Sequence, residues 1–192
     1  MFTKEQIVDA ARELFARDGF TATSVRDIAD AVGSSKATVL YHFPSKDLLL
    51  EATLQDALTG AAGLLHTLTD TTHFSGQDRL EEFITRLVDL LIEHRHALHI
   101  VITHVHLAPE VPIIARAQEL MAQLSTAMTD PGERNRESFR LELALSGATF
   151  SLVAGSLFNL TPMPEEQLRP LLLETVLDII GHSTSRPEGV GR

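Results

Sequence analysis

The stretch that decides the fold is residues 23–46, TSVRDIADAVGSSKATVLYHFPSK. Ser24 is placed to cap a helix whose apolar positions recur at helical spacing, and Gly33 ends that helix. Ser35 then caps a second helix, predicted over 36–42 and ended by the Phe-Pro-Ser sequence that follows. Two helices of about two turns each, joined by a turn that contains glycine, are the arrangement of a helix-turn-helix.

A longer helix is predicted in front of this pair, over about residues 4–18. Thr3 and Gln6 form the pattern of a capping box, and Gly19 can end the helix. The apolar residues of the segment follow the i, i+3, i+4 spacing of a helix that packs on one face. This helix can therefore brace the two shorter ones.

Helical period decides which side of residues 36–42 is exposed. The period places Val39, Leu40 and Phe43 toward the core. Five residues are then left for solvent or a partner: Lys36, Ala37, Thr38, Tyr41 and His42. Such side chains can contact phosphates, base edges and thymine methyl groups in a major groove. An ordinary surface helix in a helical bundle would show the same pattern, so the architecture alone leaves both interpretations open.

Four motifs occur in order within residues 7–50: AARELFARDGF at 10–20, TSVRDIA at 23–29, SKAT at 35–38 and HFPSK at 42–46. With these motifs, the segment resembles the N-terminal DNA-binding domain of the TetR family of one-component bacterial regulators. The resemblance covers about a quarter of the 192 residues. The length of the chain and its helical remainder also suit the family.

The resemblance implies contacts with double-stranded DNA through ten residues: Thr23, Ser24, Arg26, Ser35, Lys36, Ala37, Thr38, Tyr41, His42 and Lys46. Lys46 corresponds to a phosphate contact of the family, at a helix N-terminus whose free amides also favour an anion. The chain departs from the family pattern at Leu40, because the usual tyrosine comes one position later, at Tyr41. One residue turns the side chain by about 100°. Tyr41 is therefore not expected to make the phosphate contact of the usual tyrosine. The alternative is that Tyr41 faces the groove.

Charge is unevenly distributed along the chain. The formal net charge of −10, taken alone, argues against a nucleic-acid partner. Residues 1–48 nevertheless carry a net charge of only −1 and contain all three lysines, although a chance run in an acidic protein is an alternative explanation. The absence of cysteine excludes disulfides and thiolate chemistry. Together with an N-terminus that lacks an apolar leader segment, it predicts a cytoplasmic protein.

The rest of the chain also shows helical period without sustained alternation, so we predict an all-α protein of about nine helices. The later helices are expected at about 45–68, 78–94, 97–107, 112–128, 133–159 and from the Pro162-Met163-Pro164 break to Gly181. The predicted domains are a helix-turn-helix DNA-binding domain at 1–47, an effector-binding and dimerisation domain at 48–183, and a disordered tail at 184–192. Residues 143–160 carry no charge, but their polar residues predict a buried helix rather than a membrane span.

The last two predicted helices carry stripes that favour helix–helix packing. Small side chains that would let a second helix approach closely are Ala144, Gly147, Ala148, Ser151, Ala154 and Gly155. Apolar side chains at matching spacing are Leu168, Leu172, Val176 and Ile179. With the resemblance, the stripes predict a four-helix dimer interface, and a two-fold dimer would read a palindromic operator. Packing within one chain is the alternative.

Five histidines lie within 13 residues: His94, His96, His99, His104 and His106. Imidazoles can ligate zinc, copper or nickel, which keeps a metal-responsive regulator or metal-binding protein as the alternative function. No cysteine, HExxH motif or regular carboxylate partner accompanies them, so hydrogen-bonded or solvent-exposed histidines are favoured over a metal site. No catalytic motif stands out either, so an enzyme and a bound cofactor are not expected.

We therefore expect a ligand-responsive repressor that binds a palindromic operator as a homodimer and is released by a small, largely apolar effector. Helical face and side-chain size assign the wall of the effector cavity to Phe83, Leu87, Leu90, His99, Ile102, His106, Leu120, Met121, Leu124 and Phe150. No membrane partner is expected.

Overall fold

The computed structural model describes residues 3–70, 77–104, 106, 110–128, 136–158, 161 and 163–181. Within these ranges the chain forms nine α-helices and no strand, which confirms the all-α prediction. The predicted tail at 184–192 lies outside the described residues. The chain divides into two compact units: unit 1 is Met1–Gly63 with His94–Leu124, and unit 2 is Leu64–Glu93 with Ser125–Arg192. These boundaries differ from the predicted functional division at residue 47, which stays a prediction.

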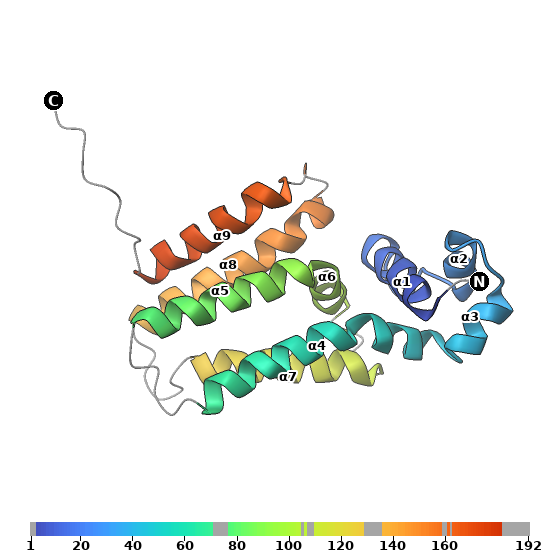
Figure 1. Ribbon diagram of the computed structural model, residues 1–192, viewed down its shortest axis with the longest axis horizontal. Helices are drawn as coiled ribbons and strands as arrows, with labels where there is room; N and C mark the ends of the chain where they lie inside the picture. The colour runs from blue at the N-terminus through green and yellow to red at the C-terminus, as the bar shows by residue number, and fades with distance from the viewer. Residues whose placement is uncertain are drawn as a thin grey trace. The chain divides into compact units, whose positions relative to one another are not determined.

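Unit 1 is built around the N-terminal helices. It contains α1 (Lys4–Asp18), α2 (Val25–Ala31), α3 (Lys36–His42), the first part of α4 (Lys46–Asp70), α6 (Arg95–Thr103) and most of α7 (Pro112–Met128). α1 packs against α2 and α6, and α2 packs against α3 (Figure 1). Each of the six helices contributes a fully buried side chain to the core of the unit: Ile7, Ile28, Val39, Leu50, Ile100 and Ile114.

Capping residues set the ends of the short helices as the sequence predicts. Thr3 and Gln6 form a capping box at the start of α1, and the Ser24 and Ser35 hydroxyls accept backbone N–H groups at the starts of α2 and α3. α6 is the exception, because it ends at Thr103 rather than near residue 107. The Thr103 hydroxyl donates to the His99 carbonyl at 2.7 Å, so side chains take part in ending this helix.

Unit 2 contains the ends of α4 and α7 and three whole helices, α5 (Gln77–Glu93), α8 (Arg136–Phe158) and α9 (Glu165–Ile180). These three helices pack against one another, and α9 contacts both others most extensively (Figure 1). Arg140, near the start of α8, donates to the carbonyls of Ile179 and Asp178 at the end of α9. Arg169, near the start of α9, pairs with Asp89 near the end of α5, with 2.6 Å between the guanidinium and the carboxylate. α9 therefore runs antiparallel to its two neighbours.

The uncharged stretch that begins at Leu143 is only partly buried. Ala144, Ala148 and Val153 are buried within unit 2, whereas Leu143 and Phe150 are about half exposed. The prediction of a fully buried helix is therefore wrong for one face of α8. Among the described residues, no helix has the length and apolar character needed to cross a membrane.

Candidate nucleic-acid interface

The turn between α2 and α3 is fixed by backbone hydrogen bonds. Gly33 has a φ of 66°, in the left-handed region that glycine adopts without steric cost. The Ser34 N–H donates to the Ala29 carbonyl at 2.8 Å, which folds the chain back over the end of α2. The side chains of Val39, in α3, and of Phe43, at its C-terminal end, are buried in the core of unit 1. Their burial fixes the rotation of α3 about its own axis.

The outward side of α3 is the side that the sequence predicts. Tyr41 is 84% exposed, Lys36 and Ala37 are exposed, and Thr38 and His42 are half-buried. The Tyr41 and His42 rings meet edge to face, with 5.3 Å between their centroids. A cation, a methyl group, a hydroxyl and two polar rings thus lie on one surface of a rigid helix.

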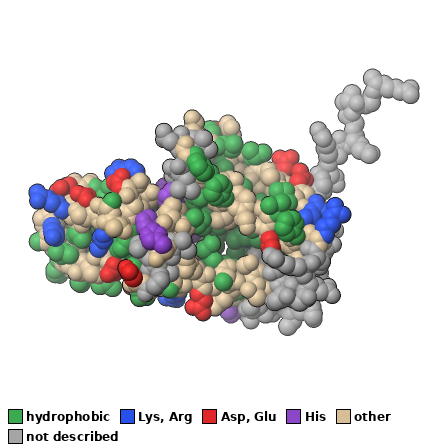
Figure 2. All heavy atoms as spheres, turned by 180° about the vertical axis from the view of Figure 1, so that it is seen from behind, with side chains coloured by type: hydrophobic (Ala, Val, Ile, Leu, Met, Phe, Trp, Pro, Cys, Tyr) green, Lys and Arg blue, Asp and Glu red, His purple; other side chains and the backbone are tan. Residues whose placement is uncertain are grey.

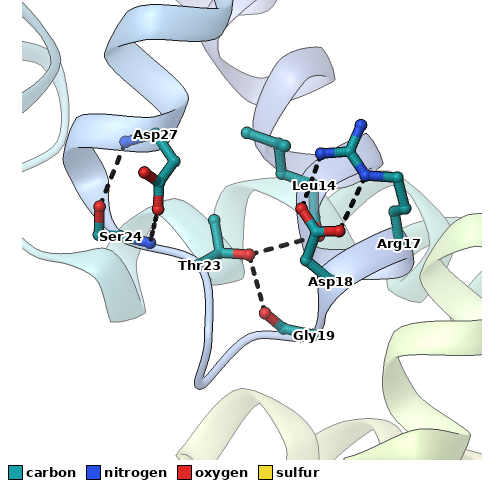
Figure 3. Close-up of polar contacts among 7 residues, drawn as sticks. All are labelled: Leu14, Arg17, Asp18, Gly19, Thr23, Ser24 and Asp27. Carbon is teal, nitrogen blue, oxygen red and sulfur yellow. Dashed lines mark hydrogen bonds and ion pairs between the residues drawn. The ribbon is translucent and has the colours of Figure 1, made fainter.

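Two serines of the predicted interface act locally as caps. The Ser24 hydroxyl accepts the Asp27 N–H at 3.2 Å, and the Ser24 N–H donates back to the Asp27 carboxylate at 2.8 Å (Figure 3). The donated N–H holds the pKa of the Asp27 carboxyl below its usual value. Ser35 accepts the Thr38 N–H and bonds to the Thr38 hydroxyl at 2.9 Å. Both serines remain at the surface, so a phosphate can still approach the helix starts they cap.

Arg26 is the basic residue of α2. Its side chain is 81% exposed, and its Nε lies 3.9 Å from the Asp30 carboxylate, at the outer limit of an ion pair. Such an exposed pair contributes little and can exchange for a phosphate contact. Figure 2 shows Lys and Arg side chains gathered at the end formed by the N-terminal helices, with acidic side chains among them.

The structure does not place the Thr23 side chain at the surface. Thr23 is only 3% exposed, and its hydroxyl bonds to the Gly19 carbonyl at 2.8 Å and lies 3.3 Å from the Leu14 carbonyl (Figure 3). A side chain so enclosed cannot reach a DNA backbone. Its assignment as a contact is corrected to a structural role in the loop between α1 and α2.

Lys46 is likewise engaged within the protein. Its Nζ donates to the Phe20 carbonyl at 2.9 Å and to the Thr23 carbonyl at 3.1 Å, and it lies 4.3 Å from the centroid of the Phe20 ring. Two of its three N–H groups therefore hold the α1–α2 loop. Sequence reasoning missed this because the partners are backbone atoms more than twenty residues away.

We expect Lys46→Met to lower the free energy of unfolding by about 1–2 kcal/mol, because hydrogen bonds from a charged donor are lost while the aliphatic stem is kept. DNA affinity should fall about equally for all sequences, since the loop and not a base contact is affected. Chemical denaturation and mobility-shift titration measure the two effects. Lys36→Met is the control, because this lysine is exposed and its loss should leave stability unchanged within about 0.5 kcal/mol. Equal stability of both variants would contradict the structural role.

Comparisons with known proteins agree with this geometry. Residues 7–53 match the family model described as bacterial regulatory proteins, tetR family. The N-terminal segment of the chain is therefore similar to the DNA-binding domain of TetR-family regulators.

Two of the relatives that the chain resembles are named transcriptional repressors. It is 34% identical over 94 residues to the HTH-type transcriptional repressor KstR2 of Mycolicibacterium smegmatis, a match that covers 49% of this chain and 45% of that protein. The chain thus spans about half the length of that relative. It is 25% identical over 203 residues to the HTH-type transcriptional repressor Rv1474c of Mycobacterium tuberculosis, covering 95% and 93% of the two chains. The solved structure of ketosteroid transcriptional regulator KstR2 of Mycobacterium tuberculosis shares the fold, with a TM-score of 0.68, 17% identity and coverage of 97% and 98%.

The structure describes every histidine of the cluster at residues 94–106. Among the described residues, which include all five histidines of the cluster, no three potential ligands come together. His104 is buried and hydrogen-bonded, whereas His96 and His106 are exposed. The structure therefore gives no support to the metal-binding alternative.

His99 is the histidine whose environment is unusual. It is 9% exposed, and its Nδ1 is buried without a hydrogen-bond partner. Burial lowers the pKa of His99. A neutral imidazole with an unsatisfied nitrogen is suited to bind a polar group of a ligand.

The predicted cavity wall is divided between the two units. His99, Ile102, His106, Leu120, Met121 and Leu124 belong to unit 1, and Phe83, Leu87, Leu90 and Phe150 belong to unit 2. Phe83 and Leu87 are buried, as a wall requires. Phe150, in contrast, is 50% exposed and contacts Phe158 edge to face on the surface of α8. Phe150 is therefore better explained by a surface role, and the cavity itself stays a prediction.

The predicted dimer stripe is partly used inside unit 2. Ala144, Ala148, Leu172 and Val176 are buried there, which is the internal packing that the sequence left open. Leu168, Ile179, Ala154 and Gly155 are half-buried, and Gly147 and Ser151 are exposed. A row of exposed apolar side chains lies on α8 beside the stripe of small residues, and the sequence analysis did not predict it. The row consists of Phe139, Leu143, Phe150 and Phe158, which we call the α8 apolar face. Leu171 of α9 is also exposed.

Proposed function

We propose that this chain is a DNA-binding transcriptional repressor that binds a palindromic operator as a homodimer and is released by a small, largely apolar effector. The observation that carries the proposal is α3, whose polar outer side is exposed while Val39 and Phe43 anchor its inner side. A rigid helix with this exposed surface can enter a major groove and read base edges.

Electrostatics support binding through the N-terminal helices. Lys36 and Arg26 are exposed at the starts of α3 and α2, where helix N-termini also favour phosphates. The protein as a whole carries −10, so its acidic remainder repels DNA at long range. Because exposed cations such as Lys36 and Arg26 would displace counterions from phosphates, we expect affinity to fall as the salt concentration rises.

The α8 apolar face supports the homodimer. Its four large apolar side chains are between 50% and 62% exposed, which is unusual for a surface that meets only water. An isologous interface would bury this face against its copy. Two recognition helices related by a two-fold axis would then read two half-sites about one helical turn of DNA apart.

Effector control is proposed from residues of the predicted cavity wall that lie within unit 1. Ile102 and Leu120 provide half-buried apolar surface, and His99 provides one buried polar atom without a hydrogen-bond partner. Such a composition suits a small apolar molecule with a single polar group. The effector can release the operator only by binding the released conformation more tightly than the DNA-binding conformation.

A genomic binding selection followed by mobility-shift titration tests the proposed function. We expect Tyr41→Ala and Thr38→Ala to change the preference between related operator sequences, by about 1–3 kcal/mol for a lost base contact. Arg26→Ala should weaken all sequences alike and reduce the slope of log affinity against log salt by about one. Arg86→Ala is the matched control, because this exposed arginine lies in α5 of unit 2. Failure of the unaltered protein to protect any genomic fragment would refute the proposal.

A further inference from the structure

One side chain of α6 is hydrogen-bonded to the loop that precedes the helix-turn-helix. His104 is the C-cap residue of α6, and its ring is buried within unit 1. Its Nε2 accepts the Phe20 N–H at 3.0 Å. Nε2 is therefore unprotonated, because the backbone amide can only donate.

The other ring nitrogen is held by the end of α6 itself. Nδ1 lies 3.0 Å from the Ile100 carbonyl and 2.9 Å from the Thr103 hydroxyl. A carbonyl can only accept, so Nδ1 carries the proton and His104 is the neutral Nδ1–H tautomer. Nε2 thus accepts a hydrogen bond and Nδ1 donates one, and a rotation of the ring would break both hydrogen bonds.

The loop that receives this bond determines where α2 begins. Phe20 is tied by its N–H to His104 and by its carbonyl to Lys46. Thr23, which is bonded to the Gly19 carbonyl, directly precedes the Ser24 cap of α2. A displacement of Phe20 is therefore passed along residues 21–24 to α2, and α2 packs against α3.

Gly19 shows how closely the ring approaches the loop. A Cβ built on Gly19 would lie 3.3 Å from the His104 Nε2, and the residue has a φ of 90° that suits glycine. The sequence thus leaves room for the imidazole at the point where α1 ends. The same helix carries His99, whose buried Nδ1 is unpartnered, five residues before His104.

We propose that His104 is a positioning residue that holds the α1–α2 loop, and through it α2 and α3, in the DNA-binding arrangement. This inference rests on the proposed function.

The tests compare His104→Leu, His104→Gln and the matched control His96→Leu, which alters an exposed histidine of α6. We expect His104→Leu to lower operator affinity about tenfold, the effect of one lost buried hydrogen bond. Hydrogen exchange of the Phe20 amide should accelerate at least tenfold. His104→Gln should recover most of both, because its side-chain oxygen can accept at the position of Nε2. His96→Leu should match the unaltered protein.

A measurement on the unaltered protein covers the case in which His104→Leu does not fold. Long-range proton–nitrogen NMR of the imidazoles should show His104 as the Nδ1–H tautomer with an unprotonated Nε2. The opposite tautomer, or an unchanged Phe20 exchange rate and operator affinity in His104→Leu, overturns the inference. If the unaltered protein binds no DNA, the proposed function fails, while tautomer and exchange data still decide whether His104 holds the loop.

Discussion

Leu143→Arg should convert the protein from a dimer to a monomer and reduce operator affinity at least a hundredfold. Leu143 is 55% exposed near the middle of the α8 apolar face, so the arginine disturbs no packing within its own chain. In an isologous interface the same substitution occurs twice, which places two like charges in an apolar contact. A monomer binds one half-site and loses the avidity of the second, which contributes about 10²–10⁴ in affinity.

Sedimentation velocity measures the oligomeric state, and mobility-shift titration measures the affinity for a full palindrome and for one half-site. The monomer should retain the unaltered protein's affinity for the half-site. Met121→Arg is the matched control, since Met121 is a similarly exposed apolar residue of α7 in unit 1. A Leu143→Arg protein that remains dimeric would show that the α8 apolar face is not the interface.

The helices of unit 1 could be predicted from local sequence because local contacts set their ends. The hydroxyls of Thr3, Ser24 and Ser35 each cap a helix by bonding to an N–H three residues later. The exposed side of α3 was predictable for a similar reason, since the buried Val39 fixes the rotation of a regular helix. The end of α6 was not, because side chains of Thr103 and His104 bond to carbonyls of its last turns.

The roles of individual site residues depended on contacts that no local pattern shows. Thr23 and Lys46 both carry polar groups suited to a phosphate, yet the fold directs them to backbone carbonyls of the α1–α2 loop. In α8, small residues and large apolar residues lie on neighbouring stripes. Only the packing of α9 decides which stripe is buried, and it buries Ala144 and Ala148 while leaving Phe139 exposed.

Phe20→Ala should be the most destabilising of the substitutions considered, lowering the free energy of unfolding by about 3–5 kcal/mol. The Phe20 ring is buried, meets the Phe15 ring edge to face at 5.3 Å, and lies beneath the Lys46 ammonium. Its removal leaves a cavity and ends both an aromatic and a cation–π contact, which add about 1 kcal/mol or more. The backbone bonds of residue 20 to His104 and Lys46 do not depend on the ring, so the loss reports on its packing.

Phe20→Ala should also weaken DNA binding, because the Phe20 ring contacts both Phe15 of α1 and Lys46 of α4. Without it the loop loses the packing that positions α2, so all operator sequences should be weakened alike. Phe20→Leu is the control: it keeps most of the buried volume and should cost less than half as much, as measured by denaturant titration. A loss below about 1 kcal/mol for Phe20→Ala would mean that the site collapses around the missing ring. The loop would then be held mainly by its polar contacts, and the His104 and Lys46 variants should show the larger effects.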